Sequence, residues 1–332
     1  MDSSRRDLRL ALALAAAILA LAVISLMSGA ANLTPRQALA GLFGGEGAEG
    51  IIVRDIRLPR TLLAILIGAT YGLAGAALQG LLRNPLAEPS LFGAPQAASV
   101  GASFMIAYGL AGATSFAVPL AGILGAFVSV GGLVAIAGRR ASLTVTLLAG
   151  LAFASFAGAG TALILNLAPT PYAALEIAFW LLGSLADRSM ADVGLIAAPV
   201  LIGWVLLAST GRSLDALTLG DATAQSLGVS LGGLRLRVIL GTALAVGACV
   251  SVVGSIAFVG LVVPHLLRPF VGHEPGRLLV PSALGGAALL IASDIAARLI
   301  PTGSELRPGV ITALIGVPFF FALVLAQRRV QP

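Results

Sequence analysis

Apolar runs long enough to cross a lipid bilayer recur along this chain, with polar connections between them. A transmembrane helix needs about 20 consecutive apolar residues. Ten segments meet or approach that length: 10–29, 61–82, 91–110, 114–138, 142–166, 192–209, 235–254, 255–271, 278–299 and 308–327. Residues 172–185 form an eleventh, shorter run, which we expect to dip partway into the membrane. The pattern predicts one all-α polytopic membrane domain of about ten transmembrane helices over residues 1–332.

The start of the chain also has the layout of a secretory signal peptide, because Arg5, Arg6 and Arg9 precede the first apolar run. That run is long for a signal peptide, and further membrane segments follow it, so we favour a retained first helix. In the polar connection over residues 30–58, Thr34 and Pro35 predict the start of a short helix.

Composition supports a membrane domain whose helices pack closely. Charged residues make up 10% of the chain, whereas soluble domains carry about 25%. The 41 glycines allow helix backbones to approach one another in lipid. Gly68 and Gly72, four residues apart, are therefore interpreted as a helix contact in preference to a direct role in transport.

The distribution of arginine predicts an orientation. Ten spans place both chain ends on one side, and cytoplasmic loops are enriched in basic residues. With the N-terminus in the cytoplasm, thirteen arginines lie inside and seven outside. The inside set is Arg5, Arg6, Arg9, Arg83, Arg139, Arg140, Arg212, Arg235, Arg237, Arg268, Arg277, Arg328 and Arg329. The outside set is Arg36, Arg54, Arg57, Arg60, Arg188, Arg298 and Arg307.

Several kinds of active site are excluded by the residues that the chain lacks. It contains no lysine, so it has no Walker A loop, and any ATP hydrolysis belongs to another subunit. Its arginines do not form the basic patch with interleaved aromatic residues that is typical of nucleic-acid binding. Cys249, His265 and His273 are too few to predict a disulfide framework or a transition-metal site. We expect no catalytic residue and no cofactor bound by this chain.

The longest polar stretch assigned to the cytoplasm, residues 210–237, has the signals of two short helices. Asp221 can cap a two-turn helix that Gly228 ends, and Ser230 can cap a second helix that runs into Arg235. Such a stiff loop is either an ordinary connector or a docking element for a cytoplasmic partner, and the residues alone leave both open.

Several sequence blocks, in order, carry a resemblance to a known family. They are Arg57-Leu58-Pro59-Arg60 with Gln79 and Asn84-Pro85-Leu86-Ala87-Glu88-Pro89, then residues 179–185, 220–228, 258–268 and 294–298, and finally Pro308-Gly309-Val310. In these blocks the chain resembles the FecCD-type permeases of bacterial ABC importers for iron–siderophore complexes, haem and vitamin B12. Arg307 departs from the Glu-Leu-Pro that is common in that family, which puts detail of the last outer loop in doubt.

The resemblance implies an importer in the bacterial inner membrane, with a type II ABC importer permease fold. Two permease copies, as a homodimer, would pair with two ATPase subunits that bind ATP and Mg²⁺, and with a periplasmic or lipid-anchored substrate-binding protein. It also implies a coupling loop at about residues 213–235, which inserts into the ATPase. The matching coupling residues are Gly220, Asp221, Ala222, Ala224, Leu227 and Gly228.

Further site residues follow from the resemblance. Arg57, Arg60 and Arg298 match positions that dock the binding protein, although Arg298 can equally pair with Asp294 one helical turn earlier.

Ser142 and Thr144 match the inner gate, although Ser142 can instead cap a helix. Glu176 and Gln79 are candidates for the transport pathway, with surface exposure as the alternative for Glu176.

These observations favour a permease for a metal chelate, with a ferric siderophore as the first expectation. Haem and vitamin B12 are alternatives within the same class of importer. A secondary transporter is a different alternative, but it would need charged residues deep in several spans. In this chain nearly all charges lie in loops or at the ends of spans.

Overall fold

The structure is a computed structural model that describes residues 2–29, 31, 33–44, 47–110, 116–137, 143–301 and 305–328. Within these residues the regular structure is entirely helical. The elements are α1 (Asp2–Met27), α2 (Pro35–Phe43), α3 (Ala48–Ile51), the π-helical η1 (Ile52–Arg57), α4 (Leu58–Leu82), the 3₁₀ turn η2 (Pro89–Phe92), α5 (Ala94–Ala107), α6 (Ala117–Ala137), α7 (Leu143–Asn166), α8 (Pro171–Leu181), α9 (Met190–Ala208), α10 (Gly211–Leu217), α11 (Asp221–Ser226), α12 (Leu231–Val253), α13 (Val259–Leu267), the 3₁₀ turn η4 (Arg268–Val271), α14 (Pro275–Leu299) and α15 (Pro308–Arg328).

Eight helices of the described chain are long and apolar enough to cross a membrane, which confirms the multi-pass architecture. Two of the ten expected segments are shorter than predicted. The segment at 91–110 contains α5, with 14 residues, and the segment at 255–271 contains α13, with nine. Nine residues of α-helix rise about 14 Å, which is about half of a 30 Å hydrocarbon core.

A backbone break explains the short α13. Gly254 ends α12 with φ +76°, and Phe258 precedes α13 in the left-handed region with φ +68°. The chain reverses over residues 254–258, so the apolar run continues in sequence while the helix axis does not. The boundary expected between the segments 235–254 and 255–271 is therefore confirmed at Gly254.

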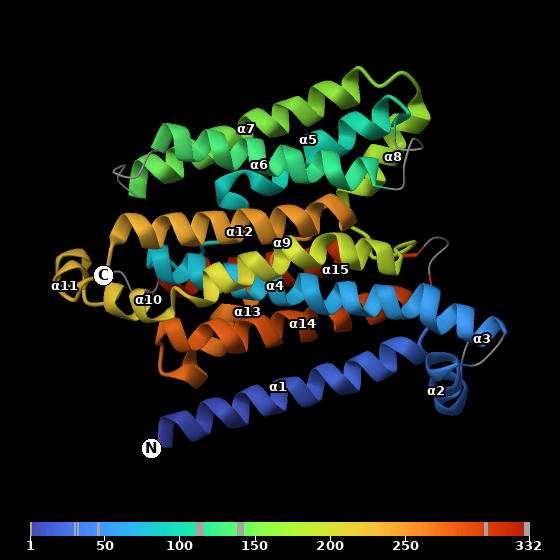
Figure 1. The fold of residues 1–332 in the computed structure, drawn as a ribbon, viewed down its shortest axis with the longest axis horizontal. Coiled ribbons are helices and arrows are strands. Elements are labelled where there is room, and N and C mark those ends of the chain that lie inside the picture. The colour runs from blue at the N-terminus through green and yellow to red at the C-terminus, as the bar shows by residue number, and fades with distance from the viewer. Residues whose placement is uncertain are drawn as a thin grey trace.

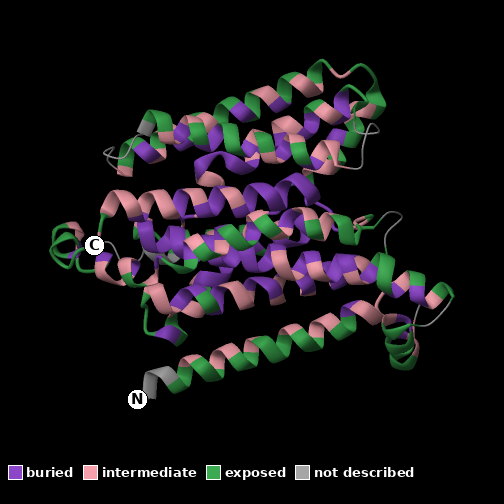
Figure 2. Cartoon of the chain, viewed as in Figure 1, coloured by how far each residue is buried: buried purple, intermediate pink, exposed green. Residues whose placement is uncertain are grey.

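Three long helices, α4, α12 and α14, form the centre of the bundle, and most of their residues are buried. Figure 2 shows this centre in purple, with the more exposed α1 and α7 at opposite edges of the molecule. The most extensive helix pair is α4 with α14, which confirms the expected glycine contact. A Cβ added at Gly72 would overlap the carbonyl oxygen of Ser282, and one at Gly68 would overlap that of Gly286. Small residues therefore set the distance between the two central helices.

The helix α1 begins, and the helix α15 ends, at the same end of the bundle as α10 and α11, which we name the α11 end (Figure 1). The opposite end carries α2 and α3 and is named the α2 end. The predicted helix α2 is confirmed, with Thr34 as its N-cap and Gln37 completing a capping box. The rest of this connection differs from expectation, because residues 48–57 are helical and lead without interruption into α4.

The helix α1 lies at the edge of the bundle and packs mainly on α14 (Figure 1). At the α11 end, Asp7 accepts two hydrogen bonds from Arg277, from Nε at 2.6 Å and Nη2 at 2.7 Å. Near the α2 end, the hydroxyls of Ser25 and Thr61 are 2.7 Å apart. Side chains near both of its ends therefore hold this exposed helix.

Candidate functional site

The coupling residues predicted from sequence gather on a small projection of the α11 end. Two short helices, α10 and α11, follow α9, and α11 extends beyond the ends of the long helices (Figure 1). Asp215 of α10 accepts a hydrogen bond from the backbone N–H of Gly276, at 2.6 Å. This contact ties the projection to the first turn of α14.

The ends of α11 are formed differently from one another. Gly220 is the N-cap with φ +97°, and Asp221 is the first residue of the helix, so the expected capping by Asp221 is wrong. Gly228, with φ +86°, ends the helix as predicted. Its N–H donates to Gln225 O at 2.9 Å, and the next N–H, of Val229, donates to Ala224 O at 3.0 Å. These two bonds form a Schellman motif, which requires a left-handed residue and so favours glycine.

The Asp221 carboxylate connects α11 to two other elements. Its Oδ1 lies 2.8 Å from Arg83 Nη2, at the end of α4, and its Oδ2 lies 4.0 Å from Arg235 Nη2 on α12. The Arg83–Asp221 pair is about half exposed, so its contribution to stability is small. Its geometry nevertheless links the orientation of α11 to the central helix α4.

The remaining coupling residues divide into an anchor and an exposed face. Ala224 is completely buried, in the same cluster as Leu214 and Leu234. Ala222 is exposed, and Leu227 is 62% exposed although it is apolar. An exposed leucine on a rigid projection is suited to contact a partner protein.

The second predicted short helix is not separate. Ser230 does cap a helix, since its Oγ accepts from the N–H of Gly233 at 3.2 Å. That helix is α12, which continues from Leu231 to Val253 without a break at Arg235. The loop after α9 therefore ends at Ser230, whereas the predicted coupling region of 213–235 extends into the first turn of α12.

At the α2 end, the three arginines proposed to dock a binding protein are brought together and largely buried. Arg60 is only 7% exposed; its Nη2 lies 2.7 Å from Asp294 Oδ1 and also contacts Glu305. Arg298 Nη2 lies 2.8 Å from Asp294 Oδ2, so the predicted pair with Asp294 is present. This second contact is an ion pair without aligned hydrogen-bond geometry. The negative charge of Asp294 thus balances the positive charges of two guanidinium groups.

Arg57 and Arg298 also bind the C-terminal end of α1. Arg57 Nη1 donates to Leu26 O at 2.9 Å, and its Nη2 donates to Ala31 O. Arg298 Nη1 donates to Ser25 O and Ser28 O, both at 2.9 Å. Carbonyl groups at a helix C-terminus attract cations, so the two arginines stabilise this end of α1.

A cavity of about 500 Å³ lies beside this arginine cluster. Its walls come from the end of α1, from η1, from the start of α4 and from the end of α14. The cavity is lined by Arg57, Arg60, Arg298 and Glu305. The guanidinium groups that make structural contacts therefore also face the cavity.

The predicted gate and pathway residues occupy different environments. Thr144 is exposed in the first turn of α7, whereas Ser142 lies outside the described residues. Glu176 is exposed on α8, which is the surface alternative raised for it from the sequence. The structure does not bring Glu176 and Thr144 together, since α7 and α8 place them at opposite ends of the bundle (Figure 1).

Gln79 is buried inside the bundle. Its Nε2 donates to Leu261 O at 3.2 Å, and its Oε1 accepts from Arg268 Nη2 at 2.5 Å. Gln79 therefore joins α4 to the short helix α13 and to η4. Arg268, Asp215 and Arg83 were not identified as site residues from the sequence, because their partners are far away in the chain. Among the described residues, no group of three or more His, Cys, Asp or Glu could hold a metal ion.

Comparisons with known proteins agree with this arrangement. The pattern of the FecCD transport family matches residues 17–326. The chain is 35% identical to the Fe(3+)-citrate import system permease protein YfmE of Bacillus subtilis, over 98% of both chains. It is 35% identical to the vitamin B12 import system permease protein BtuC of Salmonella newport, over 99% of this chain and 98% of that one.

A solved structure is similar over nearly the whole fold. It is described as an inward-facing conformation of an ABC transporter of metal-chelate type. The TM-score is 0.84 at 30% sequence identity, and the match covers 96% of this chain and 99% of the other. The chain belongs to the FecCD transport family and is a transmembrane permease subunit of an ABC importer, a transport component and not an enzyme.

Proposed function

We propose that this permease carries a ferric siderophore across the bacterial inner membrane. The observation that carries the proposal is full-length similarity to a permease named for Fe(3+)-citrate import, together with 35% identity over 93% of this chain to one named for iron(3+)-hydroxamate import in Bacillus subtilis. Vitamin B12 is the second candidate, because the vitamin B12 permease is equally similar, at 35%.

The proposed assembly contains two copies of this chain, two ATPase subunits and a substrate-binding protein. ATP and its Mg²⁺ bind the ATPase subunits, because this chain has no lysine for a phosphate-binding loop. We assign the α11 end to the cytoplasm, since Arg83, Arg212 and Arg235 lie there among the basic residues that favour that side.

The projection formed by α10 and α11 is proposed to insert into the ATPase. Three features support this role: the position of α11 beyond the long helices, the exposed Leu227, and the Asp221–Arg83 link to α4. A movement of the ATPase would displace α11, and the Asp221–Arg83 ion pair would transmit that displacement to α4 at the centre of the bundle.

The arginine cluster at the α2 end is proposed to receive acidic side chains of the binding protein. Its support is the cavity that Arg57, Arg60 and Arg298 line, which is large enough for a carboxylate side chain. The guanidinium groups already have internal partners, so docking would require the incoming carboxylate to share them with Asp294 or Glu305. Such binding weakens as the salt concentration rises.

Residues on the exposed surface of α7 and α8 are proposed to face the transport pathway between the two copies. Thr144 at the α11 end is the gate candidate with Ser142, and Glu176 at the α2 end is the acidic candidate. Gln79 is less suited to touch a substrate, because backbone and Arg268 contacts use its amide.

Uptake by the reconstituted complex tests the substrate. Proteoliposomes that contain the permease, its ATPase and its binding protein are given ferric siderophore, haem or cobalamin, with ATP inside the vesicles. ATP-dependent accumulation of the ferric siderophore alone supports the proposal. Accumulation of cobalamin in preference to iron chelates selects the second candidate, and uptake without any ATPase subunit contradicts the importer mechanism.

A further inference from the structure

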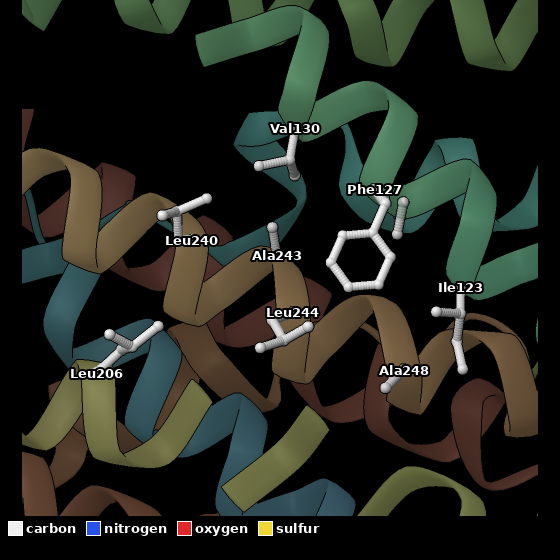
Figure 3. Close-up of a pocket in the computed structure, with 9 residues that line it drawn as sticks. Ile123, Phe127, Val130, Leu206, Leu240, Ala243, Leu244 and Ala248 are labelled. Atoms are coloured by element: carbon white, nitrogen blue, oxygen red, sulfur yellow. The ribbon is translucent and has the colours of Figure 1, made fainter. Parts of the chain in front are cut away.

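An apolar groove lies between α6, α9 and α12, away from the sites described above. Its volume is about 230 Å³. Figure 3 shows that its lining side chains converge from the three helices and that all carry carbon alone. The lining residues are Ile123, Ala126, Phe127, Val130, Leu206, Leu240, Ala243, Leu244 and Ala248.

The groove opens on the surface of the bundle. Phe127 at its wall is 51% exposed, and Val205, next to Leu206, is 69% exposed. The three helices are all long and apolar enough to cross a membrane. In a membrane, an apolar surface of this kind meets lipid hydrocarbon unless another chain covers it, and an acyl chain has the chemistry to fill the groove.

Arg237 places a positive charge beside the groove, on the side nearest the α11 end. Arg237 precedes Leu240 by one turn of α12, on the helix face that continues through Leu244 and Ala248. Its Nη1 donates to Ser209 O at 3.2 Å, and its Nε donates to Gly233 O at 3.4 Å.

Arg237 has no carboxylate partner among the residues that the structure describes, and its side chain is partly exposed. A guanidinium group at this position can bind a phosphate with the donors that its neutral contacts leave free.

We propose that this groove binds an anionic phospholipid of the cytoplasmic leaflet, with its phosphate at Arg237 and one acyl chain along α12. The length of α12 that lines the groove agrees with the thickness of hydrocarbon in one leaflet. From Arg237 to Ala248, eleven residue steps along α12, the helix rises about 16 Å, and half of a 30 Å hydrocarbon core is about 15 Å. Basic sites between helices on the cytoplasmic side are known to bind lipid head groups. The lipid would fill the space between α6 and the α9–α12 pair.

A matched control exists two residues away. Arg235 is on the same helix, but it faces the Asp221 carboxylate of α11, with Nη2 4.0 Å from Oδ2. Replacing Arg235 removes the same charge from the same end of the bundle without removing the cation next to the groove. A general effect of net charge on lipid binding would change both variants equally.

The experiment counts lipids bound to the purified permease–ATPase complex by native mass spectrometry. The complex is equilibrated in neutral detergent with phosphatidylglycerol or with phosphatidylcholine of the same acyl chains. We expect retained phosphatidylglycerol, and a roughly fivefold loss in Arg237→Gln, because one basic residue near anionic lipid contributes about that factor. Arg235→Gln should retain the lipid. Ala243→Leu, which fills the groove, should lower retention without removing a charge.

Three results would overturn the proposal. One is equal retention in Arg237→Gln and in the parent. Another is equal retention of the two lipids, which would show a site for any acyl chain without a phosphate contact. The third is an assembled complex that retains neither lipid, as expected if a second copy of the chain covers the groove. Each variant is compared only where it elutes as the intact complex.

Discussion

Arg60 of α4 and Asp294 of α14 form a buried ion pair, with Nη2 2.7 Å from Oδ1, between residues 234 positions apart in the chain. Asp294 is completely buried and also faces Arg298. The cluster that would receive a binding protein is therefore also part of the structural core at the α2 end.

Asp294→Asn should destabilise the protein strongly. It removes the carboxylate that compensates two largely buried guanidinium groups, and breaking a buried pair in this way costs about 3–5 kcal/mol. The free energy of unfolding, followed by circular dichroism as the denaturing detergent fraction rises, measures the effect. Glu305→Gln is the matched control, because the Glu305 side chain is 42% exposed and a pair of that kind contributes about 1 kcal/mol or less. Equal losses in the two variants would contradict this account.

Gly72→Ala should separate the central helices α4 and α14. The added methyl group would overlap the carbonyl oxygen of Ser282, and overpacking of this kind costs about 1–3 kcal/mol. Gly131→Ala in α6 is the control, since no atom lies within 4 Å of the position of its Cβ. That variant should be neutral, or more stable by up to about 1 kcal/mol through helix propensity. Thermal unfolding in detergent compares them, and a stable Gly72→Ala would contradict the packing role.

The sequence predicts local features well where one or two residues determine them. Thr34 and Pro35 start a helix, and Gly228 ends one, because these residues have strong conformational preferences. The alternation of apolar runs and polar connections predicts the membrane class, because the length and hydropathy of each run determine whether it can cross a bilayer.

Features that depend on distant partners are not predictable in this way. Arg83 and Asp221 are 138 positions apart, and nothing local to either residue indicates the other. The short α13 was also missed, because the apolar run over 255–271 has the composition of a span. The reversal at Phe258, with its left-handed backbone, is determined by packing against other helices and not by hydropathy.

The pair formed by Asp7 and Arg277 should hold α1 against α14 in a charge-dependent way. Asp7→Arg and Arg277→Asp should each lower stability, and the double exchange should recover part of the loss. The side chains are 28% and 26% exposed, so the coupling energy should be about 0.2–1 kcal/mol. A double-mutant cycle of unfolding free energies at low and high salt measures it. Coupling that salt leaves unchanged, or its absence, would show that the charges of Asp7 and Arg277 do not hold α1 against α14.

Gly228→Val should uncouple ATP hydrolysis from transport. The position has φ +86° with no atom within 4 Å of its Cβ, so the substitution acts through backbone strain and not through a clash. The left-handed conformation costs a residue with a side chain about 1–2 kcal/mol, and a β-branched residue is among the least suited to it. The Schellman end of α11 would then rearrange, and the exposed Leu227 would move.

Gly228→Asn is the matched control for this change, because asparagine tolerates the left-handed region. Membrane insertion and assembly with the ATPase should persist in both variants. In Gly228→Val, the loaded binding protein should no longer stimulate ATP hydrolysis, whereas Gly228→Asn should keep that response. Normal stimulation and uptake in Gly228→Val would show that α11 does not transmit movement between the ATPase and the central helices.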